Sequence, residues 1–144
     1  MRKVRIGRRS LVPLVALAIA ACSGRDRAEA ASVLYALERV RAAPKDAKGP
    51  AAELLGHLTC SSAAVCAARD RCAEVYRHFA AGMTAQARVL SEIEKLEKSP
   101  PATVAKLAEL GAELDRAEAE VNDAQAGLSS CEQAASAMRR KYGI

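Results

Sequence analysis

Apolar residues recur every three or four positions along two long stretches of the chain, residues 62–98 and 101–142. This spacing places them on one face of an α-helix, and its persistence over several heptads is typical of a coiled-coil seam. The seam rows of the second stretch are Leu107, Leu114, Val121, Leu128, Ala135, Tyr142 and Leu110, Ala117, Ala124, Cys131, Met138. Those of the first are Val65, Cys72, Phe79, Gln86, Ile93 and Ala68, Val75, Gly82, Val89, Leu96. The pattern predicts two long helices.

The segment between them, Ser99-Pro100-Pro101-Ala102, is the strongest break in the chain. Proline fits the first turn of a helix, where its missing N–H had no partner, so the segment can end one helix and start the next. The chain is therefore expected to fold back here as an antiparallel hairpin. The same seam is also compatible with an intermolecular coiled coil, but the proline turn favours the hairpin.

In an antiparallel hairpin, the positions of facing residues have a constant sum. A sum of 203 sets Gly82 opposite Val121 and Phe79 opposite Ala124, so that small residues meet large ones, as close packing requires. Leu96 then faces Leu107 near the turn. The register predicts a close approach of the two helices at Gly82.

Two shorter helices are expected before the hairpin, over about 26–43 and 51–58. The segment from Pro44 to Pro50 separates them, with two prolines and a glycine. No alternating β-branched run predicts a strand. The expected fold is therefore all-α, a long antiparallel helical hairpin with an additional N-terminal helix. Residues 26–144 form a single domain in this interpretation.

The N-terminal 21 residues have the pattern of a secretory signal peptide. Five basic residues and no acid occupy the first nine positions, and an apolar stretch follows from Leu11 to Ala21. This stretch spans roughly 16 Å at the helical rise, about half of the hydrocarbon core of a bilayer. We therefore expect a cleaved leader over 1–21 rather than a transmembrane helix.

The end of the leader, Ile19-Ala20-Ala21-Cys22, resembles the lipobox of bacterial lipoproteins. The resemblance covers residues 1–22 and implies that the Cys22 sulfur carries a diacylglycerol, that the chain is cut before Cys22, and that the new amine is acylated. Because the first helix is expected to start at about residue 26, residues 22–25 would hold the lipidated cysteine and a short tether. Since Ser23 stands where an aspartate commonly retains such proteins in the inner membrane, the resemblance implies the outer membrane, facing the periplasm or the cell surface. The alternative is an ordinary cleavage site at Ala18-Ile19-Ala20.

The remaining four cysteines form an even set, which permits two disulfides in an exported protein. The hairpin register was derived without them, yet it sets Cys72 opposite Cys131, so we predict that bond. Cys60 and Cys66 then pair with each other, provided that Cys60 folds back before the helix begins. If Cys60 is helical, a Cys66–Cys131 bond is the competitor.

The charge balance changes once the leader is removed. The whole chain has a net charge of +5, with 22 basic and 17 acidic residues. The five basic residues of the leader account for the whole excess, so the mature chain from Cys22 is neutral. Binding of a basic patch to nucleic acid or to anionic lipid is therefore not expected.

The side chains that carry chemistry have no catalytic arrangement. His57 with Cys60, Cys66 and Cys72 lacks the close pairing of a structural zinc site. His78 and the pair Ser129-Ser130 lack a motif. The run Arg139-Arg140-Lys141 suits the negative end of a helix dipole, and a membrane or partner contact is the alternative. The acidic residues are expected on solvated helix faces: Glu92, Glu94, Glu113, Asp115, Glu118 and Glu120.

These patterns predict a non-enzymatic envelope lipoprotein, without a cofactor, that scaffolds or binds an envelope protein. A thin hairpin offers much surface and little pocket volume, which favours contact over catalysis. The alternative is a small-ligand or metal-binding module at the cysteine-rich end. An enzyme with an unrecognised site is a third possibility.

Overall fold

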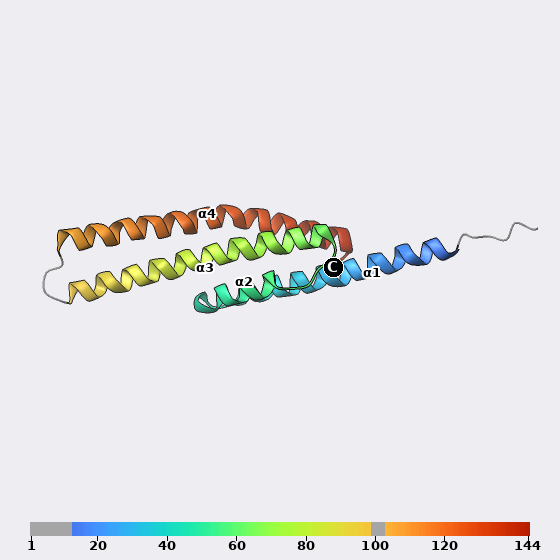
Figure 1. Cartoon of the computed structure of the whole chain (residues 1–144), viewed down its shortest axis with the longest axis horizontal. Helices are drawn as coiled ribbons and strands as arrows, with labels where there is room; N and C mark the ends of the chain where they lie inside the picture. The colour runs from blue at the N-terminus through green and yellow to red at the C-terminus, as the bar shows by residue number, and fades with distance from the viewer. Residues whose placement is uncertain (1–12, 99–102) are drawn as a thin grey trace, which may run out of the picture.

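The structure, a computed structural model, describes residues 13–98 and 103–144, with side chains from Gly24 onward except that of Glu97. It contains α1 (Pro13–Ala42), a short 3₁₀ turn (Lys45–Ala47), α2 (Lys48–Gly56), α3 (Ala63–Glu97) and α4 (Val104–Tyr142) (Figure 1). No strand occurs in these ranges. The all-α fold is confirmed.

The long hairpin consists of α3 and α4, which run antiparallel and side by side (Figure 1). Its register is the expected one at two separate points. A Cβ atom built on Gly82 would lie 2.8 Å from Val121 Cγ2, and Cys72 is bonded to Cys131. Close approach at Gly82 therefore locks α3 against α4 where a side chain would hold them apart.

A second layer, formed by α1 and α2, covers only one end of this hairpin (Figure 1). A Cβ on Gly49 would lie 3.6 Å from Ala80, and one on Gly56 would lie 3.4 Å from Ala73, so α2 runs antiparallel to α3 at close range. The largest fully buried side chains gather in this four-helix part: Val33, Leu37, Val40, Leu55, Val65, Cys72 and Cys131. We call it the base.

The hairpin continues beyond the second layer as a bare pair of helices, residues 81–97 of α3 and 104–125 of α4, which we call the arm. At the helical rise, the α3 part is about 26 Å long. Val89 and Leu110 are still buried in its seam, but Leu107, expected in the seam opposite Leu96, is 49% exposed. A two-helix layer cannot enclose both seam rows, so apolar surface remains open on the arm.

Several element boundaries differ from expectation. Helix α1 begins at Pro13 rather than at residue 26, so the expected tether 22–25 lies within a helix. Helix α2 spans Lys48–Gly56 rather than 51–58, because Pro50 falls in its first turn, where proline is tolerated. The expected turn at 99–102 and leader residues 1–12 lie outside the described residues. The long helices end within three residues of the predicted positions.

Candidate functional site

The expected anchor, Cys22, lies in α1 at the base end of the molecule. The side chains of residues 13–23 are outside the description, so the lipobox stays a prediction. Cys22 precedes Arg27 by five helical residues, about 8 Å along the axis. Arg27 Nη2 donates to the Gly143 carbonyl at 3.2 Å, which sets this part of α1 beside the end of α4. The tip of the hairpin lies at the opposite end (Figure 1).

The base is cross-linked by two disulfides. Cys72 joins Cys131 with a Cα–Cα distance of 4.9 Å, and Cys60 joins Cys66 at 5.7 Å. Cys60 lies in the loop before α3 rather than within the helix, which lets it fold back on Cys66. The competing Cys66–Cys131 pair is not formed. With every one of these sulfurs oxidised, no thiolate is left here to ligate a metal.

Glu29, a residue of α1, caps the N-terminus of α3. Its carboxylate accepts from the Ser61 hydroxyl at 2.6 Å, from the Ser61 N–H at 2.7 Å and from the Ser62 N–H at 3.1 Å. Ser62 itself makes no side-chain cap bond. These bonds, led by the one from the Ser61 hydroxyl, lower the pKa of Glu29 to about 2. The carboxylate therefore ties α1 to the positive end of α3.

Lys48, a residue of α2, caps the C-terminus of α1. Its ammonium donates to the carbonyls of Val40, Arg41 and Ala43 at 3.1, 2.9 and 3.0 Å. These carbonyls stand at the negative end of the helix dipole, and that of Val40 also accepts from the Ala43 N–H at 3.3 Å. Neither Lys48 nor Glu29 was singled out from sequence, because each acts across a loop on a helix other than its own. Both residues build the base, and neither faces an enclosed site.

The candidates for catalysis lie apart on the surface. His57 is exposed, and His78 is 59% exposed with Nδ1 3.5 Å from Glu120 Oε1. Ser129 donates to the Ala126 carbonyl at 3.0 Å, and Ser130 accepts from Arg71 at 3.0 Å. Among residues with described side chains, no polar or charged one is buried, and no group of three His, Cys, Asp or Glu residues is placed to hold a metal. The described part of the chain brings no reacting groups together.

Several acidic residues of the arm pair with nearby cations. Glu92 accepts from Lys95 at 2.7 Å, and this bond lowers the pKa of the carboxyl. Glu94 pairs with Lys98 at 2.6 Å within α3, while Glu113 of α4 pairs across the seam with Arg88 at 3.1 Å. These are the solvated, ion-paired faces that the charge pattern predicts.

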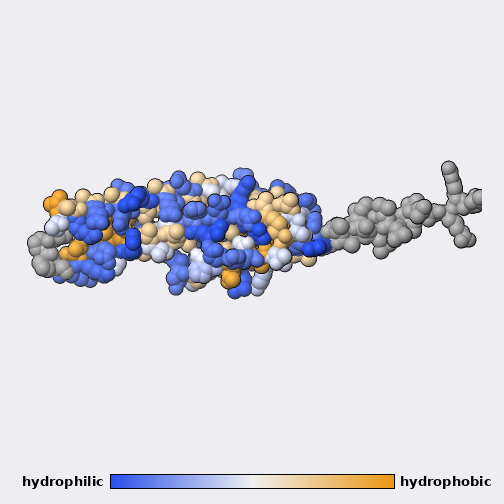
Figure 2. Space-filling model, in the orientation of Figure 1, coloured by the Kyte–Doolittle hydropathy of each residue, from blue (hydrophilic) through white to orange (hydrophobic). Residues whose placement is uncertain are grey.

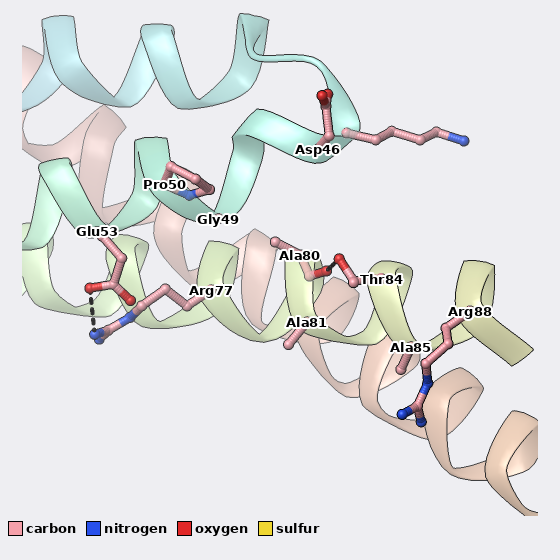
Figure 3. Close-up of a pocket in the computed structure, with 11 residues that line it drawn as sticks. Asp46, Gly49, Pro50, Glu53, Arg77, Ala80, Ala81, Thr84, Ala85 and Arg88 are labelled. Atoms are coloured by element: carbon pink, nitrogen blue, oxygen red, sulfur yellow. Dashed lines mark hydrogen bonds and ion pairs between the residues drawn. The ribbon is translucent and has the colours of Figure 1, made fainter.

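A groove of about 650 Å³ runs along the junction of α2 and α3 (Figure 3). The α3 side supplies three alanines, Ala80, Ala81 and Ala85. Charged side chains border it: Glu53 lies 3.6 Å from Arg77, and Arg88 reaches Glu113. Lys45 and Asp46 of the 3₁₀ turn also line it, so the groove offers apolar contact surface with these two charges at one end.

The arm has the larger exposed apolar side chains of the hairpin. Leu90 is 51% exposed, Leu107 is 49% and Val104 is 84%. Hydrophobic atoms are visible at this end of the molecule beside the grey turn (Figure 2). Leu90 and Met83 line a second shallow groove with Asp46, at the step where the α1–α2 layer ends.

No protein-family model, curated protein or solved structure matches this chain. In the described ranges, no helix is both long enough and apolar enough to cross a bilayer.

Proposed function

We propose that this chain is a non-enzymatic lipoprotein of a bacterial envelope, anchored through Cys22, that holds the arm away from the membrane for an envelope protein to bind. One observation carries the proposal. The helix that contains Cys22 enters the base directly, and the arm lies at the other end of the molecule (Figure 1). An anchor at one end and a bare pair of helices at the other suit a protein that presents a contact surface.

The composition of the two ends supports this interpretation. The base holds both disulfides and most of the fully buried side chains, so it is the rigid part. The arm is a single layer with Leu90 and Leu107 half exposed, and a partner helix could cover them as α1 and α2 cover the base. No observation favours the metal-binding alternative, since its cysteine ligands are oxidised.

Photocrosslinking in intact envelopes tests the proposal. A photoreactive residue at position 90 should give one adduct of discrete mass in the membrane fraction. The same residue at position 54 is the matched control, because Leu54 is an exposed leucine of the base. We expect no such adduct there. Equal adducts at both positions, or none at position 90, would contradict a partner-binding arm.

The anchor is tested separately by Cys22→Ser. We expect this variant to leave the membrane fraction in a high-salt wash while its oxidised base and helical content are unchanged. Membrane association that survives high salt after loss of the cysteine would contradict lipid attachment at this residue.

A further inference from the structure

Overall neutrality conceals a separation of charge along the molecule. The span that forms the arm and its connecting turn, residues 81–125, has 5 basic and 9 acidic residues. The rest of the mature chain, residues 22–80 and 126–144, has 12 basic and 8 acidic residues. The net charge of the arm is therefore −4 and that of the base side is +4, although the net charge of the whole mature chain is zero.

The positive charge of the base gathers at the end next to Cys22. Arg25 and Arg27 lie in the part of α1 that follows Cys22, and Arg140 and Lys141 lie in the last turn of α4. The contact between Arg27 and the Gly143 carbonyl brings the two helix ends together. All four side chains are on exposed residues, and hydrophilic surface borders the grey N-terminal residues (Figure 2).

Few acidic groups oppose these cations. Arg25 pairs with Glu29 at 3.2 Å, whereas Arg27, Arg140 and Lys141 have no ion pair among the residues with described side chains. The acids of this end are Asp26, Glu29, which is held by Ser61 and Ser62, and Asp70, which is paired with Arg69. Arg69, Arg71 and Arg139 bring the basic residues of this end to seven, and with Glu38, which pairs with Arg139 at 2.7 Å, they face four acidic ones.

We propose that this basic end, which we call the foot, binds the anionic headgroups of the membrane surface and holds the acidic arm away from it. The inference rests on the proposed attachment of lipid to Cys22, which brings the foot to the bilayer. Cys22 is only about 8 Å along α1 from Arg27. That is within one Debye length at physiological salt, where an anionic surface still attracts cations. The acyl chains would anchor the protein in the membrane, and the foot would orient it on the membrane surface.

Vesicle binding by the mature chain with Cys22→Ser tests the foot without the lipid. The fold does not require the acyl group, because the core residues and both disulfides lie between Ala30 and Met138. The protein should sediment with phosphatidylcholine vesicles that contain phosphatidylglycerol and should not sediment with phosphatidylcholine alone. Raising the salt concentration should release it.

Matched variants locate the binding surface. Arg140→Gln with Lys141→Gln removes two charges from the foot and should weaken binding about 25-fold, since each basic residue near an anionic surface contributes about fivefold. Lys95→Gln with Lys98→Gln removes two charges at the far end of α3 and should leave binding unchanged. Arg25→Gln with Arg27→Gln repeats the first test on a different helix, with circular dichroism as the check on folding.

Three results would overturn the proposal: equal binding to both kinds of vesicle, no binding to either, or an equal loss in the arm variant and the foot variants. None of them would decide whether Cys22 carries lipid, because the protein in this test has no acyl group. Failure of the foot is thereby distinguished from failure of the lipoprotein proposal.

Discussion

Replacing Gly82 by alanine should destabilise the hairpin, although alanine is the better helix former. A Cβ at this position would lie 2.8 Å from Val121 Cγ2 and 3.2 Å from both the Ala117 carbonyl oxygen and the Val121 nitrogen. Two of these atoms belong to the α4 backbone, so the strain can be relieved only by moving the helices apart. Overpacking of this kind costs about 1–3 kcal/mol, against a gain of about 1 kcal/mol from helix propensity.

Gly111→Ala is the matched control, because a Cβ there would meet nothing within 4 Å. This variant should be about 1 kcal/mol more stable than the wild type. Gly82→Ala should fall below Gly111→Ala by about 1–3 kcal/mol, or by roughly 4–12 °C in Tm for a chain of this size. Thermal and urea unfolding, followed by circular dichroism with the disulfides intact, measure both quantities.

A second substitution identifies the clashing atom. Val121→Ala removes Cγ2, so it should recover part of the stability lost in Gly82→Ala, and the two changes should not be additive. If Gly82→Ala is instead stabilised as much as Gly111→Ala, α3 and α4 do not approach at this point, and the register is refuted.

Three further predictions concern the base. Cys72→Ser with Cys131→Ser should lower the free energy of unfolding in urea by about 4 kcal/mol, whereas loss of the Cys60–Cys66 bond should lower it by about 2 kcal/mol. The difference arises because the first bond closes a loop of 59 residues and the second a loop of 6. Equal losses would contradict this account. The pKa of Glu29 is lowered from 4.5 to about 2, so its stabilisation is present above pH 4.5 and is lost as the pH falls toward 2. Glu29→Gln should therefore flatten the stability profile in that window, and an unchanged profile would refute the capping role. Lys48→Met removes the ammonium from the carbonyls of Val40, Arg41 and Ala43 at the end of α1, so it should lower the unfolding free energy by about 1–2 kcal/mol, whereas an unchanged value would show that water replaces the ammonium.

The hairpin could be predicted because its apolar residues repeat at a regular spacing along each of the two long helices. Two apolar seams with small residues opposite large ones leave one register that places Gly82 against Val121, and Cys72 meets Cys131 in that same register. The hydrophobic pattern, the packing of small against large residues and the cysteine positions all indicate the same register, and such agreement is what lets a sequence specify one structure.

The docking of α1 and α2 was not predictable in the same way. Glu29 caps α3 and Lys48 caps α1, and each reaches across a loop to a helix other than its own. A single carboxylate or ammonium that caps another helix is not marked by any periodic pattern in the sequence. The exposure of Leu107 also depends on where the second layer stops, which the heptad pattern does not contain.

The candidate surface was predictable only in outline. The sequence favoured contact over catalysis, and the proposed function keeps that interpretation. The basic foot and acidic arm were hidden by a neutral total, because Arg27 and Lys141 are distant in sequence and are brought to one end only by folding.

The most direct test of the central claim is the intact mass of the native protein purified from membranes, before and after reduction. The account predicts a chain that begins at Cys22, has the added mass of acyl chains, and gains four hydrogens when its two disulfides are reduced. A chain that begins at Ala21 without lipid would contradict it, and the protein would then be secreted without an anchor.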